Sequence, residues 1–475
     1  MRELFSRGLG GVYLIAFTSL RAQLLGLYGK RGISSVGELL EKVRAVTGRE
    51  RYRRLPTVLW LDASDRSLVR ACELGQSAAA LLALGVAPRL MSAASWALYL
   101  SFVTVGQEFL GYQWDALLLE AGLYATVAAP AGIFSVKRDE ETPAAAVWLM
   151  RWLVFRLHFE SGLCKLKSRD PAWRSCTACA YHYESQPLPT PVAWWAHLLP
   201  RPFQRLSTLL TLVIECGVPF LVFTPKKSRR SAFAILTGLQ ALIELTGNYG
   251  FFNLLTVLLD VWLLDDRTLD RQLRLAPRPP PRPAPWWRRL FTLAASLPAF
   301  ALSGGFLLAR LRKSHRLPRA LVRLHQALAP LHAVNPYGLF AVMTTRRPEI
   351  VIEGSRDGVK WREYEFRYKP GAVTGPPRFV APHQPRLDWQ MWFAALGSPR
   401  PWFERFLARL LEGAPEVSKL LARNPFSDRP PKYVRALLYE YRMTDRATRR
   451  RTGAWWTREL LGLYFPAARL SEASS

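Results

Sequence analysis

The sequence predicts an α-helical multi-pass membrane bundle over residues 1–310, followed by a soluble α+β domain over residues 335–475. Three observations lead to this fold class. Long uncharged apolar runs fill residues 9–310, and the basic residues lie in the gaps between them. Aromatic residues make up 12% of the chain and include 17 Trp, a composition that suits membrane interfaces. Beyond residue 335 the apolar residues recur with the period of two that half-buried strands show.

The charge balance narrows the class of partner. The 475 residues include 65 Lys and Arg against 36 Asp and Glu, a formal net charge of +29. Such an excess points to nucleic acid or to anionic lipid. Because the basic residues are spread over loops between apolar segments, the sequence favours a lipid bilayer and argues against nucleic acid. Five cysteines are too few for a disulfide scaffold.

Nine segments are apolar enough to be candidate membrane helices, and the shortness of several leaves a count between five and nine. The first segment resembles a signal peptide, but no small-residue cleavage site follows it, so we expect an uncleaved span. A soluble helical bundle is disfavoured because these segments mostly lack a polar face. Polar loops are expected at 29–67 and 165–203. The nine segments are 9–28, 68–87, 90–106, 110–130, 145–164, 204–223, 231–247, 249–265 and 290–309.

Lysine and arginine in the short loops predict the sidedness. Lys226–Arg230 and a Pro/Arg-rich linker at 266–289 mark the cytoplasmic face, and a helical hairpin separates them. The loop at 165–203 and the C-terminal domain therefore fall on the non-cytoplasmic side. The basic connector 311–334 favours the opposite sidedness. If segment 290–309 does not cross the membrane, the C-terminal domain becomes cytoplasmic.

The C-terminal domain is predicted to pair strands and short helices. Glu349–Gly354 alternates as a half-buried strand does, and Asp357-Gly358 is typical of a hairpin turn. Residues 361–368 alternate aromatic and charged side chains, which completes an antiparallel hairpin with one solvated face. Further along, helices are expected at 387–397, 401–412 and 415–423, and a strand at 433–443.

Ionisable side chains inside apolar segments mark function in most membrane proteins, because a charge in the bilayer is unfavourable. Asp115 and Glu120 lie about 140° apart around a helix and so form no paired acid site. Glu120 is expected to face the bundle interior, with Arg151 or Arg156 as its partner. The candidate polar cluster comprises Gln107, Trp114, Asp115, Glu120, Arg151, Arg156 and Glu160, the last two spaced for an i, i+4 ion pair.

The loop that follows the fifth segment carries a C-x-x-C pair, Cys176 and Cys179. In a thioredoxin-type context this would be a redox pair, but no strand or βαβ pattern surrounds it. Aromatic and polar residues near this pair and in the C-terminal domain favour contact surfaces, and we expect the two regions to touch. The candidate partner surface comprises Tyr181, His182, Tyr183, Glu184 and Gln186 with Trp389, Trp455 and Trp456.

Catalytic signatures are absent from the sequence. It contains no G-x-S-x-G, H-E-x-x-H, Walker loop or G-x-G-x-x-G after a strand. A zinc site would need more ligands than the C-x-x-C pair and His182 supply. The sequence therefore names no catalytic residue, no metal site and no cofactor.

Several longer motifs, in order along the chain, resemble the lipase maturation factor family over roughly residues 9–468. Motifs of this length are more specific than any short pattern above. They are Gly29–Ile33, Gly106-Gln107 with Tyr112–Asp115 and 117–120, 151–168, 181–191, Leu245–Asn253, Asn335–Gly338, 422–426, 430–442 and 452–466.

The resemblance implies a multi-pass membrane protein whose best-known relative helps dimeric secreted lipases fold and assemble through its C-terminal domain. It implies the endoplasmic reticulum membrane for a eukaryotic chain. A bacterial chain would lie in the cytoplasmic (inner) membrane, and its client would be another exported protein. The resemblance implies no catalytic residues. Two alternatives stay open: a membrane-embedded enzyme acting on a lipid-soluble substrate, and a thiol oxidoreductase that uses Cys176 and Cys179.

Overall fold

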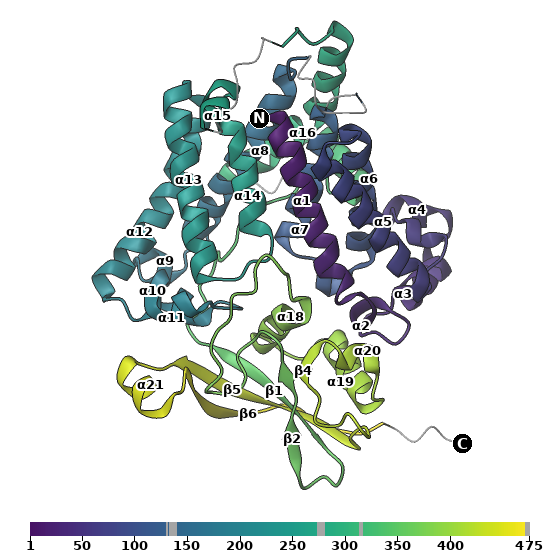
Figure 1. The fold of residues 1–475 in the computed structure, drawn as a ribbon, viewed down its shortest axis with the longest axis vertical. Helices are drawn as coiled ribbons and strands as arrows, with labels where there is room; N and C mark the ends of the chain where they lie inside the picture. Colours follow the sequence, from purple (N-terminus) through teal and green to yellow (C-terminus); the bar gives the residue numbers. More distant parts are fainter. Residues whose placement is uncertain (130–131, 133–139, 273–280, 313–316, 471–475) are drawn as a thin grey trace.

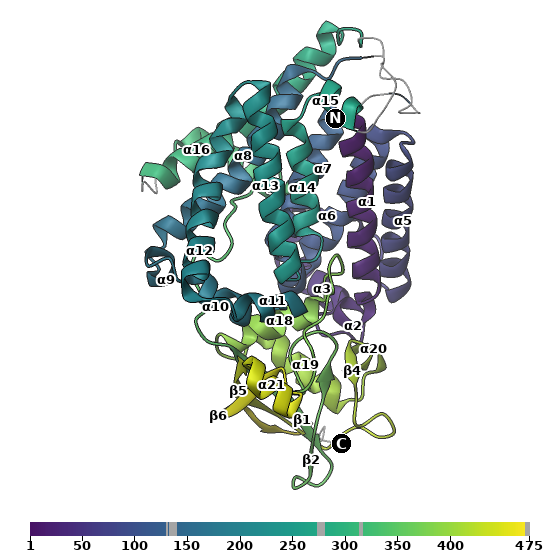
Figure 2. The ribbon, with the colours of Figure 1, turned by 60° about the vertical axis from the view of Figure 1, so that its left-hand side comes forward.

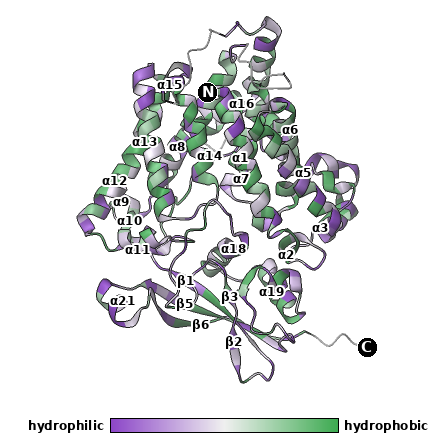
Figure 3. Cartoon of the chain, in the orientation of Figure 1, coloured by the Kyte–Doolittle hydropathy of each residue, from purple (hydrophilic) through white to green (hydrophobic). Residues whose placement is uncertain are grey.

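The computed structural model, described here for residues 1–129, 132, 140–272, 281–312 and 317–470, stacks a helical bundle on a smaller α+β domain (Figure 1). Hydrophobic residues dominate the bundle helices, whereas hydrophilic residues gather in the C-terminal domain and at the opposite end of the bundle (Figure 3). Part of the predicted Pro/Arg linker, 273–280, and part of the connector, 313–316, lie outside the described residues.

Four helices of the first half of the chain pack side by side. The chain runs back and forth, so that α1 lies against α5, α5 against α6 and α6 against α7. Helix α5 begins at a Ser64 N-cap and ends at Gly85, whose φ of 82° closes the helix in the left-handed conformation. The four helices are α1 (Arg2–Arg21), α5 (Asp65–Leu84), α6 (Pro88–Val105) and α7 (Gln113–Ala128).

The second half of the bundle is arranged around one long helix, α8 (Ala144–Lys167), which contacts helices on several sides. Two of these helices are extended by 3₁₀ turns, η4 (Val218–Phe223) and η5 (Val261–Leu263). The helices around α8 are α12 (Arg201–Gly217), α13 (Lys226–Thr246), α14 (Phe252–Asp260) and α16 (Trp286–Arg312).

Each of the nine predicted apolar segments coincides with one of these helices. Two helical stretches in the described residues, Arg201–Phe223 and Trp286–Arg312, are long and apolar enough to cross a bilayer. In the most apolar 18 residues of each stretch, only 22% and 33% of the residues, respectively, are buried within the protein. Most of that apolar surface is therefore available to lipid. The other helices of the described residues do not meet the same criteria of length and apolar composition. Helix α8, for example, carries Arg156, which pairs with Glu120 inside the bundle.

The predicted polar loops are wrong in detail, because both contain helices. Residues 29–67 and 165–203 hold short helices at the end of the bundle that meets the C-terminal domain, and the linker begins as a helix (Figure 2). Side-chain caps such as Ser35 and Asp170 start two of them. The elements are α2 (Leu24–Tyr28), α3 (Val36–Thr47), η1 (Gly48–Glu50), α4 (Arg51–Arg54), η2 (Val58–Trp60), α9 (Pro171–Arg174), α10 (Ala178–Ser185), α11 (Pro191–His197) and α15 (Asp266–Gln272).

The chain reaches the C-terminal domain through α17 (Arg319–Leu328) and η6 (Ala329–Leu331). There it forms an antiparallel sheet in the order β2-β1-β5-β6, with a separate β3-β4 pair. Three helices, α18 (Arg386–Ala395), α19 (Pro401–Leu411) and α20 (Pro415–Ser418), lie between this sheet and the bundle (Figure 1). The strands are β1 (Pro348–Ser355), β2 (Trp361–Glu363), β3 (Glu365–Phe366), β4 (Leu421–Arg423), β5 (Tyr433–Met443) and β6 (Trp456–Ala468).

The predicted strands at 349–354 and 433–443 are confirmed, whereas three other details differ. The hairpin lacks the expected solvated face along β1, because β1 is a central strand and is buried over most of its length. The alternating run 361–368 divides between two sheets, since β3 pairs with β4 rather than with β1. The helix expected at 415–423 stops at Ser418 and the chain turns into β4. Strand β6 and the short α21 (Arg446–Thr452) are additional elements.

The crossing of α1 and α5 supplies a test of the packing. A Cβ on Gly10 would lie 2.4 Å from the backbone nitrogen of Ala83, which cannot move aside alone. A Cβ on the neighbouring Gly11 would meet no atom within 4 Å. We expect Gly10→Ala to separate the two helices and to lower the free energy of unfolding by ~1–3 kcal/mol.

Gly11→Ala is the matched control, and its stability should stay equal or rise by up to ~1 kcal/mol through helix propensity. Thermal unfolding of both purified variants in detergent measures the difference. Equal melting temperatures for the two variants would contradict the close approach of α1 and α5.

Candidate functional site

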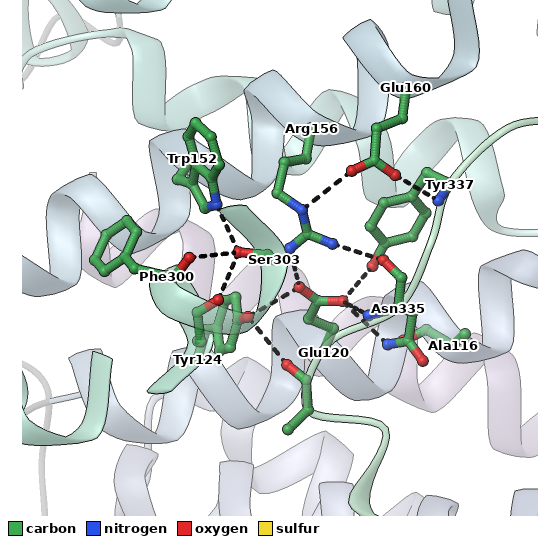
Figure 4. A network of polar contacts seen from close by, with 12 residues as sticks. Ala116, Glu120, Tyr124, Trp152, Arg156, Glu160, Phe300, Ser303, Asn335 and Tyr337 are labelled. Atoms are coloured by element: carbon green, nitrogen blue, oxygen red, sulfur yellow. Dashed lines mark hydrogen bonds and ion pairs between the residues drawn. The ribbon is translucent and has the colours of Figure 1, made fainter. Parts of the chain in front are cut away.

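Glu120 lies at the centre of a buried network of polar contacts between α7, α8 and the start of the C-terminal domain (Figure 4). Its Oε1 is 2.7 Å from Nη1 of Arg156, and both side chains are at most 1% exposed. Its Oε2 accepts hydrogen bonds from the backbone N–H of Asn335 at 2.8 Å and from the hydroxyl of Tyr337 at 2.7 Å. The hydroxyl of Tyr124 donates to Oε1 at 2.9 Å. Glu120 therefore faces the bundle interior, as predicted.

Glu160 extends the network along α8. Its Oε1 is 3.4 Å from Nε of Arg156, which confirms the i, i+4 pair. Its Oε2 accepts from the backbone N–H of Tyr337 at 2.9 Å and lies 3.4 Å from Nη1 of Arg310. Arg151 does not join the network, and its proposed pairing with Glu120 is wrong. Its Nε instead donates to the carbonyl of Trp262 at 3.0 Å, on another side of α8.

The geometry of this network favours anchoring over acid–base chemistry. Each oxygen of Glu120 and of Glu160 has at least one donor or cationic partner in the part of the chain that the structure describes. A carboxylate held by that many donors has no free oxygen to offer a substrate. Several of these donors belong to Asn335 and Tyr337, where the chain enters the C-terminal domain. The network therefore fixes that entry point.

A second buried ion pair joins the bundle to the C-terminal domain directly. Arg386, the first residue of α18, meets Asp115 of α7 through two parallel contacts of 3.0 and 2.9 Å, and both side chains are 0% exposed. Nη1 of Arg386 also donates to the carbonyl of Phe109 at 2.7 Å. The Tyr99 hydroxyl donates to Asp115 Oδ1 at 2.5 Å. Burial alone would lower the pKa of Arg386, but the charge of Asp115 raises it above its ordinary value, so the guanidinium stays charged.

Aromatic side chains surround this second pair. Trp114 stacks on Tyr112 with ring centroids 4.7 Å apart and meets Trp389 edge-on at 4.8 Å. Gln107 opens the 3₁₀ turn η3 (Gln107–Leu110) with a left-handed φ of 44°, and this turn presents the Phe109 carbonyl to the C-terminal domain. The candidate polar cluster is thus two clusters, one around Glu120 and one around Asp115, while Arg151 belongs to neither.

A third contact fastens α10 to the C-terminal domain. Arg347 is 0% exposed, and its Nη1 donates to the carbonyl of Glu184 at 2.7 Å. Its Nη2 donates to the carbonyl of Pro187 and to Oε1 of Glu349, at 2.9 and 2.8 Å. The indole of Trp392 donates to the carbonyl of Ser185 at 2.8 Å. The predicted contact between the 181–191 region and the C-terminal domain is therefore confirmed.

Most of the candidate partner surface is buried or half-buried within the chain rather than exposed to solvent. Gln186 is buried between Tyr249 and the carbonyl of Thr246, and Trp389 is 3% exposed. Trp456 is buried near Arg347, and Trp455 lies under the guanidinium of Arg449. The side chains expected to face a partner are therefore largely covered by other parts of the same chain. Tyr181, at 38%, is the exposed member, while His182, Tyr183 and Glu184 are half-buried.

Two histidines of this interface are held neutral. His182 Nε2 lies 3.2 Å from the Tyr249 hydroxyl, and burial lowers the pKa of His182 to about 4. His383 Nδ1 lies 2.9 Å from the Ser19 hydroxyl, and burial likewise lowers its pKa to about 4. At neutral pH both therefore contribute hydrogen bonds rather than charge.

The C-x-x-C pair is reduced in the structure, with Cys176 half-buried and Cys179 buried. Burial raises the pKa of Cys179, which disfavours the thiolate that a redox nucleophile needs. Among the described residues no group of three or more His, Cys, Asp or Glu side chains is placed to hold a metal ion.

Arg347, Arg386 and Asn335 are site residues that no short motif in the sequence points to. A buried Asp115 requires a cation, but the sequence holds 65 Lys and Arg and does not say which one. Asn335 stands in the motif Asn335–Gly338, which resembles the family pattern but carries no signal of its own for a buried contact. The sequence does carry one signal for Arg386: it is the one cation in the largely apolar helix α18.

Removing one member of the Asp115–Arg386 pair should be far more harmful than removing both. Arg386→Met leaves the Asp115 carboxylate buried without its counter-ion, so we expect a loss of ~3–5 kcal/mol in the free energy of unfolding. The double variant Asp115→Leu with Arg386→Met should recover most of that loss, because no buried charge remains.

Arg423→Met is the matched control, since Arg423 and Glu365 form an exposed pair worth about 0–1 kcal/mol. Unfolding of the purified full chain in detergent measures all three variants. A loss for Arg386→Met no larger than that for Arg423→Met would refute the anchoring role of the pair.

Comparison with known protein families accounts for both parts of this structure. The family model described as the lipase maturation factor transmembrane domain matches residues 1–271, and the one described as the lipase maturation factor C-terminal domain matches residues 333–466. No solved structure matches the chain significantly.

Individual relatives match over nearly the whole chain. Lipase maturation factor 2 of Gallus gallus is 37% identical over 99% of this chain and 82% of its own length. The Homo sapiens lipase maturation factor 2 is also 37% identical, over 99% of this chain and 83% of the relative. Homo sapiens lipase maturation factor 1 is 33% identical over 99% of this chain and 88% of the relative. The chain therefore belongs to the lipase maturation factor family.

Proposed function

We propose that this chain is a membrane-anchored maturation factor that assists the folding and assembly of secreted or exported lipases through its C-terminal domain. The observation that carries the proposal is the match to lipase maturation factors 1 and 2 over 98–99% of the chain, which includes both the bundle and the C-terminal domain. In this proposal most or all of the nine long helices cross the membrane. The membrane is that of the endoplasmic reticulum in a eukaryote, or the cytoplasmic membrane in a bacterium.

The geometry of the buried contacts supports a binding role rather than catalysis. The ionisable groups of the candidate cluster other than Arg151 are engaged in ion pairs at the junction of the bundle and the C-terminal domain. A membrane-embedded enzyme would need convergent polar groups left free for a substrate. A thiol oxidoreductase would need an exposed, low-pKa cysteine, whereas Cys179 is buried and its pKa is raised.

Strand β6 offers a surface for an unfolded client. It is 13 residues long and stands at the edge of the sheet, so one side of its backbone has no strand beside it in the described structure. Leu460, Leu461 and Leu463 on this strand are 54%, 44% and 60% exposed. An exposed apolar edge strand is a template for β-strand addition by another chain. We infer that an extended segment of the client lipase pairs along β6.

The basic segment Lys226–Arg230 supports a non-cytoplasmic C-terminal domain. The basic start of α13, Lys226–Arg230, lies at the end of the bundle away from the C-terminal domain, since the other end of α13 leads to Asn248, which bonds to the carbonyl of Arg378 (Figure 1). The positive-inside rule assigns the basic end to the cytoplasm. The C-terminal domain then faces the compartment that receives exported lipases.

Expression in cells that lack their own lipase maturation factor and produce a dimeric secreted lipase tests the role. We expect the chain to raise secreted lipase activity per unit of lipase protein at least fivefold. Leu463→Asp should abolish most of this gain, because a charge on β6 opposes pairing with an apolar client. Val359→Asp is the matched control: Val359 is 79% exposed in the β1–β2 turn and should tolerate the change.

The double variant Cys176→Ser with Cys179→Ser should keep full activity, because neither thiol acts in the proposed mechanism. Loss of activity at normal protein level in this variant would instead favour the oxidoreductase. Failure of the unaltered chain to raise lipase activity at all would refute the proposed function. If Leu463→Asp and Val359→Asp gave equal activities, strand β6 would have no role in the proposed function.

Single-cysteine labelling tests the sidedness. The chosen sites are Ser398 in the C-terminal domain and Lys227 at the basic end of the bundle, both of which are exposed. In a background with the five native cysteines changed to alanine, we expect a membrane-impermeant maleimide to label Ser398→Cys only from the non-cytoplasmic side of sealed vesicles. Lys227→Cys should react only from the cytoplasmic side. Labelling of both sites from one side would overturn the topology.

A further inference from the structure

Helix α16 matches the thickness of a bilayer between two pairs of arginines. Residues 290–309 contain no charged side chain, and a helix of that length spans about 30 Å, the thickness of the hydrocarbon core. Arg288 and Arg289 precede this uncharged run, and Arg310 and Arg312 follow it. The second pair of arginines therefore marks the level at which α16 leaves the hydrocarbon.

Helix α17 crosses α16 close to this level. A Cβ on Gly305 would lie 2.6 Å from Cδ1 of Leu321 and 3.8 Å from Cδ2 of Leu317. The ring of His325 packs edge-on against Phe306, with centroids 5.1 Å apart. Contacts spread over about two turns of chain, from Leu317 to His325, thus meet two adjacent residues of α16, so α17 runs across α16 rather than along it.

The crossing places α17 along the membrane surface, because α16 itself crosses the bilayer. Gly305 lies roughly 6 Å inside the end of the uncharged run. Amphipathic helices that lie in the plane of a membrane are buried to about 5–10 Å, so this depth is the one expected for such a helix.

The two faces of α17 differ in character. Leu321, Leu324 and Leu328 are half-buried, and the last two pack against the core of the bundle. Arg319 and Arg323 are exposed on the opposite face. Because they are four residues apart, their guanidinium groups lie one helical turn apart and can contact a single phosphate from two sides.

These arginines have no counter-ion in the part of the chain that the structure describes. Neither Arg319 nor Arg323 makes an ion pair or a hydrogen bond there, and the same holds for the exposed Arg312. The sequence supplies no acid nearby, since residues 311–334 contain five Lys and Arg and no Asp or Glu. The membrane surface at this end of α16 therefore carries positive charge that attracts an anion.

The apolar neighbours of these arginines indicate the source of the anion. Leu308 and Leu311 of α16 are 52% and 43% exposed, and Val322, between the two arginines in sequence, is 38% exposed. An acidic protein segment or free phosphate would leave these side chains in water, whereas a phospholipid covers them with its acyl chains. Unpaired arginines beside exposed apolar side chains therefore favour a lipid anion.

We propose that α17 and the adjoining end of α16 bind an anionic phospholipid. Arg319 and Arg323 donate hydrogen bonds to its phosphate, and its acyl chains lie against Leu308 and Leu311. A zwitterionic phospholipid binds more weakly, because the same arginines repel the cation of its headgroup. The inference needs α16 to lie in a membrane, but it needs neither a lipase client nor a particular sidedness, so its test is independent of the proposed function.

The test uses the full chain in phosphatidylcholine nanodiscs that contain a trace of photoreactive phosphatidylglycerol. The readout is covalent labelling of α17, mapped by mass spectrometry after chymotryptic digestion. Arg319→Gln with Arg323→Gln should lower this labelling roughly tenfold, because each arginine near an anionic headgroup adds to the attraction.

Arg450→Gln with Arg451→Gln is the matched control, since it removes two exposed arginines from α21 in the C-terminal domain. Labelling of α17 in this control should equal that of the unaltered chain. Thermal unfolding of both double variants is expected to match the unaltered chain. Equal labelling of α17 in the two double variants would overturn the site.

A second comparison within the unaltered chain tests recognition of the headgroup and needs no variant. Photoreactive phosphatidylcholine should label α17 roughly tenfold less than photoreactive phosphatidylglycerol does. Equal labelling by the two lipids would overturn the preference for an anionic headgroup. Unlabelled phosphatidylglycerol should compete for the site. Equally strong competition by inorganic phosphate or by soluble polyglutamate would assign the arginines to a water-soluble anion and overturn the lipid.

Discussion

The structure depends on one constraint: charges that are buried between the bundle and the C-terminal domain must be paired across that boundary. Asp115 is fully buried in α7, and its counter-ion Arg386 lies in α18, on the other side of the junction. The Glu120 and Arg156 pair likewise includes backbone and side-chain groups of Asn335 and Tyr337. Leaving one member of such a pair alone is strongly destabilising. The two parts of the chain therefore hold one relative orientation.

This constraint also explains why the C-terminal domain is not a tethered accessory. Both Nη groups of Arg347 donate to carbonyls at and just after the end of α10, and Trp392 donates to the carbonyl of Ser185, the last residue of that helix. Arg405 of α19 donates to the carbonyl of Ile33, between α2 and α3. Contacts thus reach the bundle from several sides of the domain. A client on β6 would act at a fixed height above the membrane rather than at the end of a flexible arm.

Much of the architecture could be predicted from the sequence, because the helices and strands concerned depend on patterns of neighbouring residues. Apolar runs located the nine long helices, and period-two alternation located β1 and β5. Glu120 and its pairing with Arg156 and Glu160 followed from the cost of a charge in hydrocarbon and from helical spacing.

Long-range partners could not be read in the same way. Nothing local joins Asp115 to Arg386. The 181–191 segment looked available for another protein because Arg347 and Trp392, which hold it, lie some 160 residues or more along the chain. The burial of β1 on both faces had the same cause, since it depends on strands and helices that come later. Most of the short helices within 29–67 and 165–203 have eight residues or fewer, too few to show a helical period. Helix α3 does show an apolar face and could have been predicted.

The separation of Asp115 and Arg386 by 271 positions has a consequence for biosynthesis. Translation proceeds at about 5–20 residues per second, so Asp115 is made roughly 14–54 s before its counter-ion. During that interval α7 holds a carboxylate with no arginine to meet it, and the nascent bundle cannot reach its final packing. Completion of the membrane part therefore waits for the last third of the chain, and a ribosome that stalls between the two residues would leave a protein with an unsatisfied acid at its centre.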